Sequence, residues 1–278
     1  MLLIDHTKGL AGLSTFCNVF CGLRRYITSP VLRCLAILIT VLIPLGAVAS
    51  DARSAVEAFV ARLAGAQITD LAIEQTFTLF HPDGRHPQST GDQRVWVKVP
   101  RRQRVEQVLE GRREVRLVAD GQVWLRSADG RVYEAPPSER DRDRTHLVMP
   151  FRRGASDVLA EWRALGVRDD VSHVTRQAGR AVTVIGAKPG ERDTPAVWID
   201  AEHGVVRFIR RERLPGGEGV VDLAFSEHRP LLGAVFFPHR QEAFVNGKLL
   251  ILVIVRSVAV NTGLADALFD PEALRQGR

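Results

Sequence analysis

Residues 71–100 read LAIEQTFTLFHPDGRHPQSTGDQRVWVKVP, and this stretch decides the fold class. Apolar and polar residues alternate through 71–80 and again through 92–99. A period of two places alternate side chains on opposite faces of a β-strand. Asp83-Gly84, between the two runs, is a hairpin signal. The stretch therefore predicts two antiparallel strands, each with one apolar face.

The same pattern recurs along most of the chain after residue 100. Turn residues separate many of the runs, and Asn246-Gly247 is a strong type I′ hairpin signal. The further predicted strands are 104–110, 114–119, 122–126, 131–135, 172–177, 181–187, 196–200, 205–214, 219–228, 236–245 and 249–260. Roughly a dozen antiparallel strands form a sheet too large to stay flat, so we expect it to curl around a concave interior.

Three segments carry helical spacing instead. In 52–64 the apolar residues recur every three or four positions, which gives one apolar face for packing on a sheet. A second helix is expected from an N-cap at Ser156 to the vicinity of Gly166, and a short one at 266–274. Few helices on a large antiparallel sheet predict the α+β class.

The last predicted strand differs from the others, because residues 249–255 are apolar at every position. A strand of an antiparallel sheet with one face in water alternates. We therefore expect helices to cover one face of this strand and the core to cover the other.

The N-terminal residues predict export. Arg24, Arg25 and Arg33 precede an apolar run at 34–48, which ends in the small residues Ala47-Val48-Ala49 of a signal-peptidase site. The run is shorter than the ~20 residues of a membrane-spanning helix, although an uncleaved anchor is the alternative. We assign 1–49 as a signal peptide with an over-long n-region, which leaves the true start codon open, and 50–278 as a single periplasmic domain.

Composition excludes several classes of protein. The chain has 278 residues, of which 45% are hydrophobic and 25% charged, so intrinsic disorder is excluded. All three cysteines lie in the predicted leader, which removes disulfides and thiol chemistry from the mature chain. The leader also holds four basic residues and one acidic residue, so the net charge falls from +6 to +3. We expect no nucleic-acid partner.

Catalytic and metal-binding motifs are missing. The sequence contains no HExxH, no GxSxG, and no glycine-rich phosphate loop between a strand and a helix. The closest glycine run, at 216–219, joins two predicted strands. We therefore predict a protein that is not an enzyme and needs neither cofactor nor metal.

Several short motifs occur in the order found in one known family. Gln75 and Phe77 are followed by Gly91-Asp92, by Trp96-Val97-Lys98 with Pro100, and by Ala119-Asp120-Gly121, with Trp124 one place early. The C-terminal FFPHR at 236–240 and LFDP at 268–271 add to the set. Together they resemble the LolA-type periplasmic lipoprotein carriers and the related lipoprotein-sorting proteins.

That resemblance implies an incomplete β-barrel with a helical lid and a cavity for lipid acyl chains. It also implies a monomer that receives its cargo from an inner-membrane donor and passes it to an outer-membrane acceptor. Enterobacterial members carry an arginine before the proline of their W-V-K-R-P motif, which holds the lid, whereas this chain has Val99. The lid must therefore be controlled differently here, and neither the cargo nor the two partners can be named.

The candidate cavity residues are the inward-facing positions of the predicted strands, with two tryptophans that line the cavity if the opposite parity faces inward. They are Ile73, Phe77, Leu79, Val95, Trp96, Val97, Val99, Val115, Leu117, Trp124, Leu125, Val182, Val184, Val197 and Ile199.

The predicted function is that of a carrier for lipid acyl chains, because a cavity of aliphatic side chains with few polar groups suits them. The alternatives are a lipid- or lipoprotein-sensing regulatory protein of the envelope, an enzyme of unknown type and a purely structural envelope protein.

Overall fold

The computed structural model describes residues 51–119, 121–135, 149–214 and 217–276. Contacts within the chain separate Met1–Val48 from Ala49–Arg278, and every described residue belongs to the second unit. The predicted signal peptide and its cleavage site lie outside the described residues and stay a prediction.

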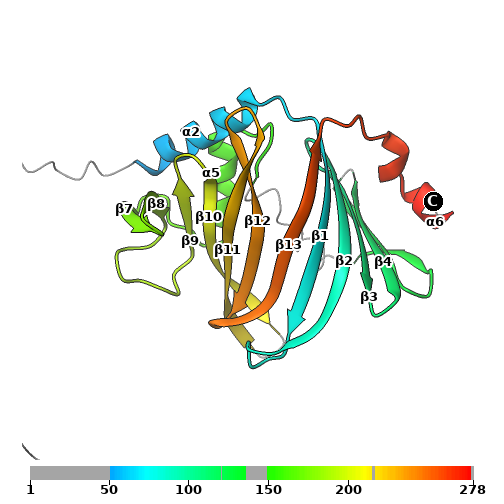
Figure 1. The fold of residues 1–278 in the computed structure, drawn as a ribbon. Helices are drawn as coiled ribbons and strands as arrows, with labels where there is room; N and C mark the ends of the chain where they lie inside the picture. The colour runs from blue at the N-terminus through cyan, green and yellow to red at the C-terminus, as the bar shows by residue number, and fades with distance from the viewer. Residues whose placement is uncertain (1–50, 120, 136–148, 215–216, 277–278) are drawn as a thin grey trace, which may run out of the picture. The chain divides into compact units, whose positions relative to one another are not determined.

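The described strands form one 13-stranded antiparallel sheet with the order β6-β5-β4-β3-β2-β1-β13-β12-β11-β10-β9-β8-β7. Neighbours in the sheet are consecutive in sequence except at β1 and β13 (Figure 1). The edge strands β6 and β7 do not pair with each other, so the curled sheet stays open. The predicted incomplete barrel is confirmed.

The strands lie close to the predicted ranges, and β2 and β11 are longer than expected. Their bounds are β1 Asp70–Phe80, β2 Pro87–Lys98, β3 Arg102–Leu109, β4 Arg112–Ala119, β5 Gln122–Arg126, β6 Val132–Glu134, β7 Ser172–Gln177, β8 Arg180–Ile185, β9 Ala196–Asp200, β10 Gly204–Leu214, β11 Gly217–Leu232, β12 Val235–Val245 and β13 Lys248–Val260.

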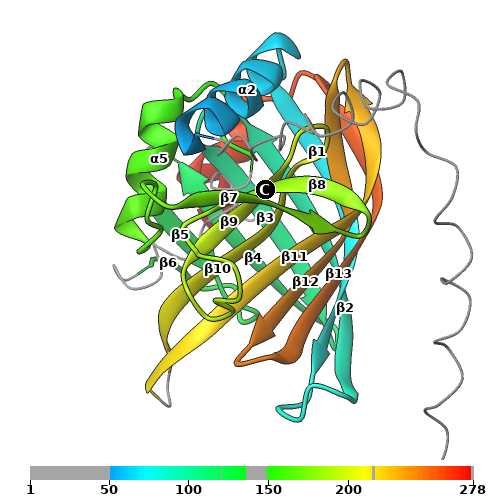
Figure 2. The same cartoon turned by 90° about the vertical axis from the view of Figure 1, so that its left-hand side faces the viewer.

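Two helices pack together over one end of the concave face (Figures 1 and 2). Helix α2, Ala52–Gly65, begins at Asp51, whose carboxylate accepts a hydrogen bond from Arg53 N at 3.1 Å. Helix α5, Ala155–Ala164, begins after Gly154 without a side-chain cap, so the expected cap by Ser156 is wrong. The buried faces of both helices join inward-facing strand residues in the main hydrophobic core.

The C-terminal segment covers part of the opposite, convex face. A 3-10 helix η1, Asp266–Phe269, and helix α6, Pro271–Arg275, lie against the strands β3, β4 and β5. Phe269 and Leu274 pack there on Val115 and Leu117. The predicted helical stretch at the C-terminus is thus present, and it closes a second, smaller apolar cluster.

Strand β13 departs from the expectation that both of its faces are covered. Of its continuous apolar run only Val255 is buried, and Ile251 is 38% exposed. The convex side chain of Leu252 lies between Thr78 of β1 and Glu242 of β12. Neighbouring polar side chains shield this face in part, and no described helix lies over it.

A buried carboxylate ties the first strand to the last. Asp70 is 3% exposed and accepts hydrogen bonds from Thr262 N at 2.7 Å, Thr262 Oγ1 at 2.8 Å and Gly263 N at 3.1 Å. Burial alone raises the pKa of Asp70, but these hydrogen bonds and one from Thr69 outweigh it and lower the pKa. The ionised carboxylate therefore holds the end of β13 against the start of β1.

We expect Asp70→Ala to lower the free energy of unfolding by about 2–4 kcal/mol, because buried donors lose their charged acceptor. Urea unfolding at neutral pH measures the loss. Asp193→Ala, which removes an exposed loop carboxylate, is the matched control and is expected to change stability by less than about 0.5 kcal/mol. Equal stability of the two variants would contradict the role of Asp70.

Candidate functional site

An apolar cavity lies between the concave face of the sheet, where β1 to β5 and β12 line it, the segment before α5, and α5 itself. Its volume is about 240 Å³, just below the range of ~300–1,000 Å³ usual for ligand sites and far above the space of one water molecule. Most of its lining is aliphatic or aromatic, and includes Leu71, Ile73, Val97, Val99, Val118, Val123, Met149, Phe151 and Phe237.

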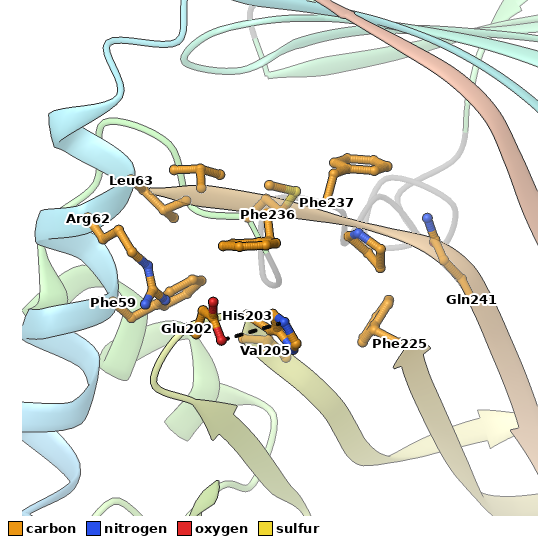
Figure 3. Close-up of a pocket in the computed structure, with 13 residues that line it drawn as sticks. Phe59, Arg62, Leu63, Glu202, His203, Val205, Phe225, Phe236, Phe237 and Gln241 are labelled. Atoms are coloured by element: carbon orange, nitrogen blue, oxygen red, sulfur yellow. Dashed lines mark ion pairs between the residues drawn. The ribbon is translucent and has the colours of Figure 1, made fainter. Parts of the chain in front are cut away.

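A smaller lobe of about 50 Å³ lies beneath α2 (Figure 3). Phe59 and Leu63 of α2 face Val205, Phe225 and Phe237 across it. Met149 and Phe237 line both spaces, so these two side chains separate a larger and a smaller lobe of one interior.

Charged groups stand at the rim of the larger lobe. Arg153 Nη1 and Glu161 Oε2 are 2.5 Å apart, and the arginine side chain is only 10% exposed. Arg101 and Arg102 also line the rim, and Arg102 pairs with Asp266 at 2.9 Å. Gln103, which is 7% exposed, also lines this lobe, so the walls are mostly apolar with a few polar side chains among them.

The structure brings several sequence-predicted residues together at this interior. Ile73, Val97 and Val99 line the larger lobe. Val95, Val197 and Ile199 belong to the main core on the same concave face. Phe77 and Leu79 continue that face along β1, farther from the helices.

Four other candidates do not lie at the cavity, so the prediction that they line it is corrected. Val115, Leu117, Trp96 and Trp124 lie on the convex face, beneath η1 and α6. On β4, Leu117 lies opposite Arg104 and faces outward. Its neighbour Val118 lies opposite Gln103 and faces inward instead.

Two further candidates on β8 also face outward. Val182 and Val184 pack with Trp198 in a separate convex cluster, whereas Ile185 faces the main core. Leu125 does lie on the concave face, in a mainly polar depression discussed below.

Sequence reasoning missed the residues that reach the interior from other elements. Met149, Phe151, Phe225 and Phe237 come from a loop and two distant strands. Phe225 and Phe237 lie in strands, where an aromatic residue is as typical of core packing as of a cavity wall, and Met149 and Phe151 lie in a loop without periodicity, so no pattern distinguishes these four.

Two stacked histidines lie at the edge of the smaller lobe. The rings of His203 and His228 are 4.5 Å apart and nearly parallel, and Phe236 packs edge-on against His203. Burial, and then the nearby His203, lower the pKa of His228 to about 4. Asp200, held by Arg180 at 2.7 Å, opposes this shift but does not cancel it.

Within the described residues, no group of three or more His, Cys, Asp or Glu side chains is placed to hold a metal ion. The same part of the chain has no helix that is long and apolar enough to span a membrane.

Solved structures share this fold, although neither sequence comparison found a match. A scan against protein-family models found no match, and a search of curated proteins found no similar sequence. A structure from Vibrio parahaemolyticus, assigned to the outer membrane lipoprotein-sorting proteins, matches at TM-score 0.52 and 14% identity over 81% of this chain and 99% of that chain.

A DUF1329 family protein from Desulfovibrio piger matches at TM-score 0.53 and 14% identity, over 81% of this chain and 100% of that chain. A LolA superfamily protein from Nitrosomonas europaea is a weaker match, at TM-score 0.49 and 10% identity over 78% and 97% of the two chains. The chain therefore has the fold of the lipoprotein-sorting structure and of the DUF1329 structure. At these identities the likeness establishes the fold alone.

We expect the stacked histidines to make stability depend on pH. Because the folded pKa of His228, about 4, lies below its ordinary value of 6.5, the unfolded chain takes up the proton first as the pH falls. The free energy of unfolding should therefore drop between pH 7.5 and 5.0, with a contribution from His228 on the order of 1 kcal/mol after allowance for solvent screening.

Urea unfolding at the two pH values measures this contribution. His228→Phe, which keeps an aromatic ring beside His203 but cannot titrate, should reduce the drop. His81→Phe, at an exposed loop position, is the control and should leave the drop unchanged. The same drop in wild type and His228→Phe would rule out this role.

Proposed function

We propose that the protein is a periplasmic carrier that binds lipid acyl chains between the curled sheet and its helices. The observation that supports this most directly is the interior of about 240 Å³, whose lining is mostly aliphatic and aromatic. Aliphatic walls reward apolar ligands in proportion to the area removed from water, at ~0.8 kcal/mol for each buried methylene. The LolA-like fold is consistent with this proposal.

Binding a long chain requires more room than the interior offers. Met149 and Phe237, which divide its two lobes, are the side chains whose movement would join them. Helices α2 and α5 contact each other and pack on the concave face, so a small outward shift of the pair would enlarge the same space. In this proposal the two helices act as the lid, without an arginine in place of Val99.

The cellular role follows from the same proposal. Residues 1–49 direct export and are removed, and the mature monomer collects its lipid or lipoprotein cargo from an inner-membrane donor and delivers it to an outer-membrane acceptor. Part of the gross burial energy is offset by the cost of ordering the ligand, which favours release at the acceptor. No chemical step is needed for transfer, so the carrier is not an enzyme.

Protein purified from the periplasm should carry co-purified lipid in native mass spectrometry, and delipidated protein should bind a dansyl-labelled fatty acid. We expect Val97→Phe to weaken that binding about tenfold, because the larger ring takes the place of roughly two ligand methylenes in the cavity. Fluorescence titration measures the change.

The control is Val174→Phe, which adds the same ring at a position on edge strand β7 that is 50% exposed. It should bind like wild type. Lipid-free protein that also fails to bind the labelled fatty acid would overturn the proposed function. Unchanged affinity in a folded Val97→Phe variant would show that the ligand lies elsewhere.

A further inference from the structure

A row of polar side chains crosses the concave face of four neighbouring strands. Gln75 Nε2 donates to Gln93 Oε1 at 2.5 Å, Gln93 Nε2 donates to Gln107 Oε1 at 3.4 Å, and Gln107 Nε2 donates to Glu114 Oε2 at 3.0 Å. Gln75, Gln93, Gln107 and Glu114 lie directly opposite one another in the registers of β1, β2, β3 and β4. We call these four residues the glutamine row.

On β1 to β3 the row interrupts a face that is apolar immediately on either side, whereas on β4 Arg116 lies opposite Val105. Two residues toward the helices, Ile73 lies opposite Val95, and Val95 lies opposite Val105. Two residues in the opposite direction along β1, Phe77 packs over Gly91. A Cβ added at Gly91 would lie 2.7 Å from the Phe77 ring. Contact with these apolar neighbours does not explain why four polar side chains lie here. Their hydrogen-bonding groups therefore need another explanation.

A depression of about 410 Å³ lies over the row. Its walls include Gln93, Gln107, Glu114, Arg116, Leu125 and Tyr133. Register places it beside the apolar cavity. Val118 and Val123 line the cavity, and Arg116 and Leu125, each two residues along the same strands, line the depression. We call these two neighbouring spaces together the groove, with an apolar end beneath the helices and a polar end at the row.

The chemistry of the polar end favours an uncharged ligand. Each amide in the row uses one N–H as donor, which leaves a second N–H and an oxygen lone pair on the half-buried Gln93 and Gln107. Hydroxyl groups match this mixture, because each both donates and accepts. An anion can use only the donors and meets the Glu114 carboxylate, whose charge offsets that of Arg116.

We propose that the glutamine row is a head-group subsite, which takes the uncharged, hydroxyl-bearing head group of a ligand whose acyl chain lies in the apolar cavity. The proposal rests on the proposed function, since it needs an acylated ligand. Glycerol and sugar head groups share the required chemistry.

The test compares ligands with one twelve-carbon chain and different head groups. Monolauroylglycerol, dodecyl glucoside, methyl laurate and dodecyl phosphate compete against the uncharged fluorescent probe N-phenyl-1-naphthylamine. Wild-type protein should bind one or both of the hydroxyl-bearing ligands about tenfold more tightly than methyl laurate, which offers no hydroxyl. The hydroxyl-bearing ligand that binds more tightly identifies the head group as glycerol or sugar.

The variant Gln93→Leu with Gln107→Leu should lose this preference while it still binds methyl laurate as wild type does. Gln107→Met alone should lose part of it, and serves if the double variant does not fold. Gln122→Leu, at an exposed position of β5 outside the groove, is the matched control and should keep the full preference.

The outcomes separate the two proposals. A preference that survives in the double variant, or is absent from wild type, overturns the head-group subsite and leaves acyl binding intact. Tighter binding of dodecyl phosphate than of both hydroxyl-bearing ligands also overturns it, because Arg116 would then dominate. Failure of every ligand to displace the probe overturns the proposed function as well.

Discussion

The antiparallel pairing of β1 with β13 is the constraint on which the rest of the fold depends. Every other pair joins strands that are consecutive in sequence, whereas Thr69 N reaches Asn261 Oδ1 across 192 positions. Without that pairing the chain would form two separate meanders, each too short to enclose an interior. The ionised Asp70, which is buried, stabilises the junction, because hydrogen bonds to a charged acceptor are strong.

The same pairing decides what the concave face can hold. Helices α2 and α5 fill one end of it with Phe59, Leu159 and Trp162, and these residues build an ordinary close-packed core. The remaining space has two lobes, and Met149 and Phe237 line both of them. The proposed carrier function requires such a balance, because a fully packed interior leaves no room for a ligand and a wide empty one costs stability.

The sequence predicts the sheet well, since alternation and turn residues are local signals. It also predicts the inward face of β2, because Val95 and Val97 alternate there with Arg94, Trp96 and Lys98. It fails at β4, where Leu117 and Val118 are adjacent and equally apolar. Only the register with β3 decides between them, and a shift of one residue exchanges the two faces. Leu117 can face outward because the C-terminal helices cover the outward-facing apolar residues of β4.

The lining aromatics and the glutamine row are the parts that no local pattern reveals. Gln75, Gln93, Gln107 and Glu114 are spread over 40 positions of sequence and meet only because β1 to β4 pair without a shift at these residues. On the other side of β1, a bulge between Glu74 and Gln75 sets Gln75 opposite Val255, and the row ends. The polar end of the groove therefore belongs to one half of the sheet, while the helices close the other end. In the proposed function this arrangement gives an acylated ligand one favourable orientation, with its chain beneath the helices and its head group on the row.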